Sequence, residues 1–190
     1  AGEYTAPKAG DTIVDVCGAP GGKSINAALK MSEQGDCGRV IARDLSDYKV
    51  ALIDENIKRL NITNIQTQVY DALDCDESLI NKADIVIADL PCSGLGIIGR
   101  KPDIKYNASP EKLQSLVDLQ RDILKVVSRY VKSGGVLMYS TCTINRAENE
   151  DNADWICKES GFTKDGEYHQ LLPANNSGMD GFFVARLIKN

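Results

Sequence analysis

Two cysteines lie in short motifs that could bring two thiols into one site. Cys92 lies in the sequence DLPCSG and Cys142 in STCT, and each motif follows an apolar run. A thiolate is a strong nucleophile when a nearby group lowers the thiol pKa or removes its proton. A single cysteine is more often a small buried side chain, which is our interpretation of Cys37, Cys75 and Cys157. Cys92 and Cys142 are therefore the candidates for covalent catalysis.

A glycine-rich stretch, Asp15–Ser24 (DVCGAPGGKS), is the second chemical signal. Such a loop lets the backbone approach a ligand and directs a helix N-terminus at it. Its end, GKS, matches the end of the phosphate-binding pattern G-x-x-x-x-G-K-[ST], but Cys17 stands where that pattern begins with glycine. Asp44 follows Lys23 by 44 − 23 = 21 residues. A carboxylate at this spacing accepts hydrogen bonds from ribose hydroxyls, which favours a nucleoside ligand over a triphosphate.

Alternating strands and helices are expected to position these residues. Strands are predicted at Thr12–Cys17, Arg39–Asp44, Ile65–Val69, Asp84–Asp89, Val136–Thr141 and Phe182–Ile188, most of them from short apolar runs. Helical spacing and capping residues predict helices at Lys23–Met31, Asp47–Leu60, Pro110–Lys132 and Ala147–Lys158, the third being ended by Gly134 and Gly135. This alternation implies an α/β fold with a mainly parallel, doubly wound sheet. The last strand has no helix after it and is expected as an antiparallel addition at the edge.

The carboxyl ends of the parallel strands are the expected ligand edge of such a sheet. Asp71 and Asp89 follow two of the predicted strands and would add acceptors there, although each alone is more often a solvated cap. Residues 93–109 form a long stretch without clear periodicity, and loops of that length are usually functional or disordered. Three basic residues in it, Arg100, Lys101 and Lys105, are candidates for phosphate contacts.

Composition narrows the class of protein. The chain has 190 residues and a net charge of −5, which suits one domain and disfavours a free-standing nucleic-acid binder. It has no apolar run of ~18 residues and no signal-peptide pattern at its start, which predicts a cytoplasmic protein without a membrane span. The six cysteines form no C-x-x-C pair and His169 is the only histidine, so we expect no metal site.

Five motifs together resemble those of a known enzyme family. DVCGAPGGKS, DLPCSGLG, GRKPDIKY, STCT and GMDGFFVARL are similar, in this order, to motifs of the RNA cytosine-C5 methyltransferases of the bacterial Sun/RsmB type, which modify small-subunit ribosomal RNA. Gly18, Leu90 and Tyr106 depart from the family's usual residues, and none of these changes removes a reacting group. The resemblance implies the Rossmann-like class I fold that binds S-adenosylmethionine, here residues 1–190 as one catalytic domain. The family's N-terminal RNA-binding region, often NusB-like, is not expected in these residues.

The resemblance also implies roles for individual residues. Asp44 would hold the ribose, Asp71 would lie beside the adenine, and Asp89 would face both the cofactor and the target base. Cys142 would add to C6 of cytosine and Cys92 would assist product release. The full cofactor-binding set is Cys17, Gly18, Ala19, Pro20, Gly21, Gly22, Lys23, Asp44, Asp71 and Asp89.

Alternatives remain open at this stage. DNA cytosine methyltransferases use the cysteine of the Pro-Cys motif as the nucleophile, so the two cysteine roles could be exchanged. A P-loop NTPase and a cofactor-binding module without activity of its own are the competing functions. RNA is the expected partner, whereas DNA and membranes are not.

Overall fold

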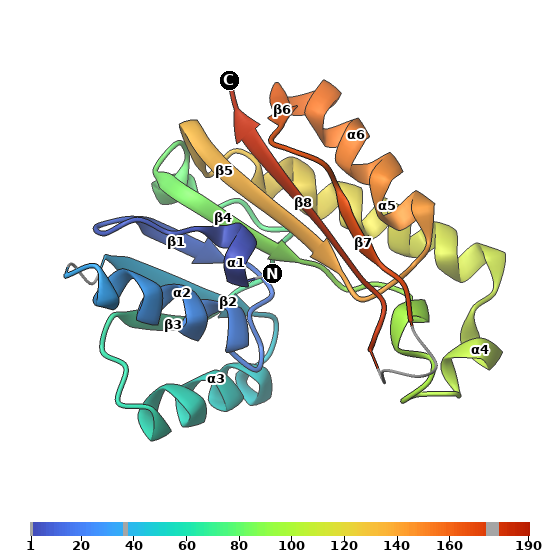
Figure 1. The fold of residues 1–190 in the computed structure, drawn as a ribbon, viewed down its shortest axis with the longest axis horizontal. Coiled ribbons are helices and arrows are strands. Elements are labelled where there is room, and N and C mark those ends of the chain that lie inside the picture. Colours follow the sequence, from blue (N-terminus) through green and yellow to red (C-terminus); the bar gives the residue numbers. More distant parts are fainter. Residues whose placement is uncertain (1, 36–37, 174–178) are drawn as a thin grey trace.

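The computed structural model describes residues 2–35, 38–173 and 179–190, and within them the strands form one sheet (Figure 1). The sheet has eight strands in the order β3-β2-β1-β4-β5-β8-β6, with β7 also paired to β8. Their bounds are β1 Thr12–Asp15, β2 Arg39–Asp44, β3 Ile65–Val69, β4 Ala83–Asp89, β5 Val131–Thr141, β6 Phe162–Lys164, β7 His169–Leu171 and β8 Phe182–Lys189. β1 to β5 pair in parallel and β8 runs antiparallel to β5, which confirms the predicted topology.

Helices cover both faces of this sheet (Figure 1). They are α1 Gly2–Thr5, α2 Gly22–Glu33, α3 Asp47–Arg59, α4 Ile104–Asn107, α5 Pro110–Val127 and α6 Glu150–Ser160, with 3₁₀ turns η1 Glu77–Leu79, η2 Leu95–Ile97 and η3 Arg146–Glu148. α2 and α3 lie on one face, and α5 and α6 lie on the other. Within the described ranges, no helix combines the length and apolar character needed to cross a membrane.

The two faces explain why the central strands read as continuous apolar runs. In β4, Val86 packs in the core cluster under α5 and α6, while its neighbours Ile85 and Ile87 pack in the cluster under α2. Successive strand residues point to opposite faces, so a strand covered on both sides needs apolar residues at every position. The buried strands therefore hold their carboxyl ends in fixed relative positions.

The prediction for the third helix was wrong at its C-terminal end. α5 begins as expected, with the Ser109 side chain accepting a hydrogen bond from the Lys112 N–H at 3.3 Å, but it ends at Val127. Tyr130 and Val131 are buried in the core, and β5 already begins at Val131. Gly134 and Gly135 lie inside β5, where its pairing with β4 changes register, and do not end a helix.

Other boundaries differ for local reasons. The first strand ends at Asp15 because the glycine loop turns there, and the last helix begins at Glu150 after η3. Residues 93–109 include η2 and α4, so they are not wholly irregular. β6 and β7 were not predicted because each has only three residues and mixed burial, which leaves no apolar run to detect.

Candidate active site

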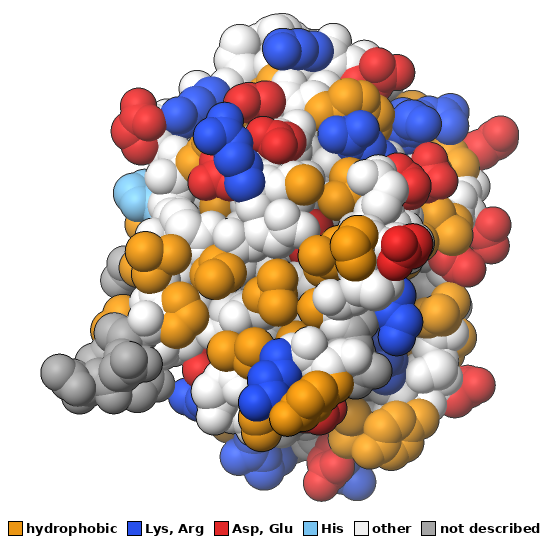
Figure 2. Space-filling view, turned by 90° about the vertical axis from the view of Figure 1, so that its right-hand side faces the viewer, with side chains coloured by type: hydrophobic (Ala, Val, Ile, Leu, Met, Phe, Trp, Pro, Cys, Tyr) orange, Lys and Arg blue, Asp and Glu red, His pale blue; other side chains and the backbone are white. Residues whose placement is uncertain are grey.

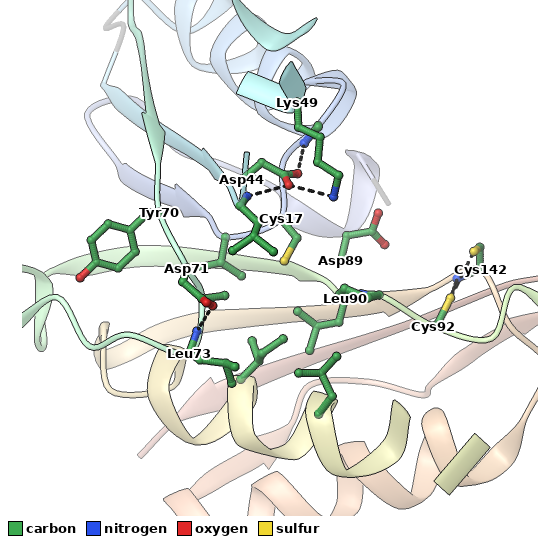
Figure 3. Close-up of a pocket in the computed structure, with 17 residues that line it drawn as sticks. Cys17, Asp44, Lys49, Tyr70, Asp71, Leu73, Asp89, Leu90, Cys92 and Cys142 are labelled. Carbon is green, nitrogen blue, oxygen red and sulfur yellow. Dashed lines mark hydrogen bonds and ion pairs between the residues drawn. The ribbon is translucent and has the colours of Figure 1, made fainter. Parts of the chain in front are cut away.

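Two adjoining cavities open at the carboxyl ends of the parallel strands. One of about 380 Å³ runs from Asp44 to the two cysteines Cys92 and Cys142 (Figure 3). The other, of about 460 Å³, lies over the glycine loop. Cys17, Ala19 and Asp89 line both cavities, so the two spaces are neighbours. The ligand edge expected from the sequence therefore carries two neighbouring cavities.

The glycine loop is a tight turn between β1 and α2. The Gly18 N–H donates to the Arg43 carbonyl at 2.7 Å, and the Gly21 N–H donates to the Gly18 carbonyl at 2.6 Å. Gly21 has φ +105°, a conformation that side chains rarely adopt, and a Cβ there would lie 3.1 Å from Ile53 Cγ2. The turn therefore requires glycine and exposes backbone to the second cavity.

Asp44 and Asp71 place acceptors along the first cavity (Figure 3). Asp44 is 4% exposed, and its carboxylate accepts hydrogen bonds from the Ala19 N–H at 3.0 Å and the Leu45 N–H at 2.8 Å. Lys49 forms an ion pair with it at 3.0 Å. The Asp71 carboxylate accepts from the Leu73 N–H at 2.9 Å. Both acids have fixed orientations, as a site for a polyhydroxyl group needs.

Asp15 lines the second cavity, and sequence reasoning gave it no role of its own. It is fully buried, and one carboxylate oxygen accepts from the Ser24 hydroxyl at 2.6 Å. The other oxygen has no hydrogen-bond partner among the described residues. Burial raises the pKa of this carboxyl to about 6. Its position as the last residue of β1, directly before the glycine loop, was the signal that could have identified it.

Lys23 and Asp89 form an ion pair where the two cavities meet. The other Asp89 oxygen accepts from the Ser140 hydroxyl at 2.6 Å. The Lys23 ammonium also lies 5.7 Å from the centroid of the Phe182 ring. In a phosphate-binding loop this lysine would face the phosphates. Here the Lys23 ammonium is paired with Asp89.

The two motif cysteines are in contact. β4 and β5 pair with Asp89 opposite Ser140, so the loops that follow these strands lie side by side. The Cys92 and Cys142 sulfurs are 3.2 Å apart, and the Cys142 N–H donates to the Cys92 sulfur at 3.3 Å. The hydrogen bond from Cys92 lowers the pKa of Cys142 to about 7 and raises the pKa of Cys92. Cys142 is therefore the better nucleophile near neutral pH.

The remaining cysteines differ from this pair. Burial raises the pKa of Cys17 to about 12, so its thiol stays protonated near neutral pH and lines the cavity without acting as a nucleophile. Cys75 and Cys157 are partly buried against the core, close to their expected place. Cys37 lies outside the described residues.

The residues predicted to contact RNA do not line either cavity. Arg100 is exposed and forms an ion pair with Asp180 at 3.0 Å. Lys101 is also exposed, and the Lys105 ammonium lies 4.8 Å from the centroid of the Tyr106 ring. Figure 2 shows lysine and arginine side chains scattered among acidic ones over the face it presents. The structure therefore brings the cofactor and cysteine candidates together but not the basic ones.

The doubly wound parallel sheet, with its antiparallel last long strand and ligand edge, is the fold of the class I S-adenosylmethionine-dependent methyltransferases. Within that class, the chain belongs to the 16S rRNA methyltransferase RsmB/F family, whose model matches residues 3–188.

Relatives with known names support this membership. The chain is 37% identical over 202 residues to the probable ribosomal RNA small subunit methyltransferase B of Bacillus subtilis, covering 96% of this chain and 44% of that protein. It is 33% identical to the ribosomal RNA small subunit methyltransferase F of Escherichia coli O157:H7, covering 93% of this chain and 40% of that protein. The chain thus spans less than half the length of these relatives.

A solved structure agrees with the fold. NSun6 from Pyrococcus horikoshii, whose crystal structure was determined with SFG, has a TM-score of 0.85 and 28% identity. The match covers 99% of this chain and 50% of that one.

Proposed function

We propose that this chain is the catalytic domain of an enzyme that transfers a methyl group from S-adenosylmethionine to C5 of cytosine in small-subunit ribosomal RNA, in the cytoplasm. The observation that carries the proposal is the contact between Cys92 and Cys142, 3.2 Å apart, in the same cavity as Asp44 and Asp89. Family membership supports it. An NTPase function is not supported by the family or by the pairing of Lys23 with Asp89.

The residues of the two cavities fit S-adenosylmethionine. Asp44 and Asp71 offer carboxylate acceptors to the adenosine portion between apolar side chains such as Leu90 and Ile123. Asp15 and the backbone of Gly18, Ala19 and Gly22 line the second cavity and would hold the charged methionine portion, because a carboxylate shielded from solvent favours a nearby cation. The bound cofactor supplies a sulfonium methyl group that a carbon nucleophile can accept.

Cytosine C5 is a weak nucleophile, and Cys142 is placed to activate it. Addition of its thiolate to C6 raises the electron density at C5. The lowered pKa of Cys142 makes the thiolate available near neutral pH. Asp89, held by Lys23 and Ser140, would orient the base by accepting a hydrogen bond from its amino group.

Cys92 is placed to release the product. Cys92 first gives its own proton to solvent water. Its thiolate then takes the C5 proton, the C5–C6 double bond forms again, and Cys142 leaves as a thiolate. The raised pKa of Cys92 makes it the stronger base of the pair. The directions of these two pKa shifts favour Cys142 as the nucleophile over the exchanged assignment.

Denaturing gels of protein incubated with S-adenosylmethionine and a small-subunit ribosomal RNA fragment test the assignment. We expect Cys92→Ala to accumulate a covalent protein–RNA adduct and Cys142→Ala to form none. Cys157→Ala, which changes a cysteine outside the cavities, is the matched control and should behave as wild type. The reverse result for the two motif cysteines would exchange their roles. Cofactor binding without adduct in any variant would indicate a binding module.

We also propose that Arg100, Lys101 and Lys105 contact RNA phosphates. Their support is exposure on the segment that follows the Pro-Cys motif. Since Arg100 is paired with Asp180, RNA would have to compete with that ion pair.

A further inference from the structure

A buried glutamate lies behind the two catalytic cysteines. Glu148, the last residue of η3, has 0% exposure, and no lysine or arginine of the described chain forms an ion pair with it. Its carboxylate accepts four hydrogen bonds instead. The donors are the Ser93 N–H at 2.9 Å, the Ser93 hydroxyl at 2.6 Å, the Gln120 amide at 3.0 Å and the Asn145 amide at 3.0 Å.

These donors come from both cysteine loops. Ser93 follows Cys92 directly, and Asn145 lies three residues after Cys142. The Gln120 amide, reaching in from α5, also donates to the Pro91 carbonyl at 2.9 Å, directly before Cys92. One carboxylate therefore ties the Pro-Cys loop to the Thr-Cys loop and to the helix beneath them.

A hydrogen bond between two hydroxyl groups connects Glu148, through Ser93, to Thr143, the residue after Cys142. The Ser93 and Thr143 hydroxyl oxygens are 2.7 Å apart. Ser93 has one hydroxyl hydrogen, which Glu148 accepts, so Thr143 must donate to Ser93. The residue after each cysteine is thus held, directly or through one hydroxyl, by Glu148.

A carboxylate is the side chain that this arrangement requires. Each Glu148 oxygen accepts from two donors, and an amide would turn one acceptor into a donor facing two others. Burying a charge without a counter-charge costs free energy unless hydrogen bonds compensate. An apolar side chain at this position would leave all four donors without their acceptor, so the carboxylate also contributes to stability. The hydrogen bonds of Glu148 to both cysteine loops indicate that it also sets the geometry of the site.

We infer that Glu148 is a positioning residue that fixes the distance between Cys92 and Cys142, so that one thiol hydrogen-bonds to the other and both reach the same cytosine. The reaction in this inference rests on the proposed function. The placement of the thiols does not, because it can be measured without RNA or cofactor.

Equilibration with a glutathione redox buffer measures that placement. Oxidised glutathione and the two protein thiols exchange to give the Cys92–Cys142 disulfide and two reduced glutathione molecules, so the equilibrium constant reports the effective concentration of one thiol at the other. A disulfide needs sulfurs ~2.05 Å apart, which is a short approach from 3.2 Å. Alkylation followed by peptide mass spectrometry quantifies the disulfide in each variant.

We expect Glu148→Gln to lower this equilibrium constant at least tenfold. Glu159→Gln is the matched control, because it makes the same chemical change at an exposed position of α6, and should leave the constant unchanged. Ser93→Ala removes two hydroxyl contacts without touching the acid and should act in the same direction. If Glu148 acts through Ser93, the double variant should cost less than the sum of the two single effects.

The rate of methyl transfer to RNA gives a second readout. Glu148→Gln should lower kcat while the affinity for S-adenosylmethionine stays within twofold, since Glu148 does not line either cavity. A folded Glu148→Gln protein with an unchanged thiol equilibrium would overturn the inference. If that variant does not fold, an unchanged equilibrium in Ser93→Ala would do so. If Glu148→Gln shifts the thiol–disulfide equilibrium but Cys92→Ala, with Glu148 intact, forms no RNA adduct, the proposed function is contradicted and the positioning role stands.

Discussion

The buried Asp15 carboxylate should lower the free energy of unfolding at neutral pH, so the variant Asp15→Asn should be more stable than wild type there. The Asp15 carboxyl is fully buried, and burial raises its pKa from the usual 3.8 to about 6. A raised carboxyl pKa stabilises the fold fully only below 3.8, and that contribution is lost as the pH rises through 6. Asp15→Asn removes the charge but keeps an oxygen that can accept the Ser24 hydrogen bond.

The size of the effect follows from the two pKa values. They differ by about two pH units, and each unit corresponds to ~1.4 kcal/mol, so the variant should gain ~3 kcal/mol relative to wild type between pH 4 and pH 8. The gain should approach its full size above about pH 7 and should vanish only below about pH 3. A constant offset from the new amide would not change this pH dependence.

Urea unfolding of both proteins at several pH values between 4 and 8 measures the difference directly. Calorimetric titration of S-adenosylmethionine into the same samples should show weaker binding to Asp15→Asn at pH 8, because the variant has lost the carboxylate that would face the methionine portion. A stability difference that does not change with pH, or one that falls as the pH rises, would refute the reasoning.

Two further predictions concern the first cavity. Asp44→Ala should weaken S-adenosylmethionine binding about ten- to a hundredfold in calorimetry, because hydrogen bonds to a carboxylate contribute ~1.5–3 kcal/mol. Glu159→Gln is the control. Unchanged affinity of Asp44→Ala for S-adenosylmethionine, or tight binding of ATP, would contradict the assignment. Iodoacetamide alkylation of Cys142, followed by peptide mass spectrometry, should rise with pH to a plateau with a midpoint of about 7. In Cys92→Ala the midpoint should move up toward ~8.5, since the donor that favours the thiolate is gone; a downward move would count against this explanation.

Much of the fold could be predicted from local patterns. The strand patterns of β2, β3 and β8 and the Ser109 cap of α5 depend on neighbouring residues alone, and the structure has them where the patterns indicated. The end of α5 could not be predicted in this way. Tyr130 and Val131 extend a helical pattern by composition, but both are buried against the core, Tyr130 in a turn and Val131 at the start of β5. Tertiary packing decided between two conformations that the local sequence allows equally.

The candidate site divides in the same manner. The glycine loop, Asp44 and the two cysteine motifs are local signals whose residue types predicted a nucleoside site next to two thiols, and the resemblance of the motifs to a known family added the expected reaction. The contacts between the motifs depend on the fold. Pairing of β4 with β5 brings Cys92 within 3.2 Å of Cys142, although the two are 50 residues apart in the chain.

The unpartnered oxygen of Asp15 and the four donors around Glu148 likewise depend on burial and on neighbours from distant elements. Hydrogen bonds and pKa values are set by atoms within a few ångströms. The sequence orders such atoms along the chain, and the fold alone brings them together.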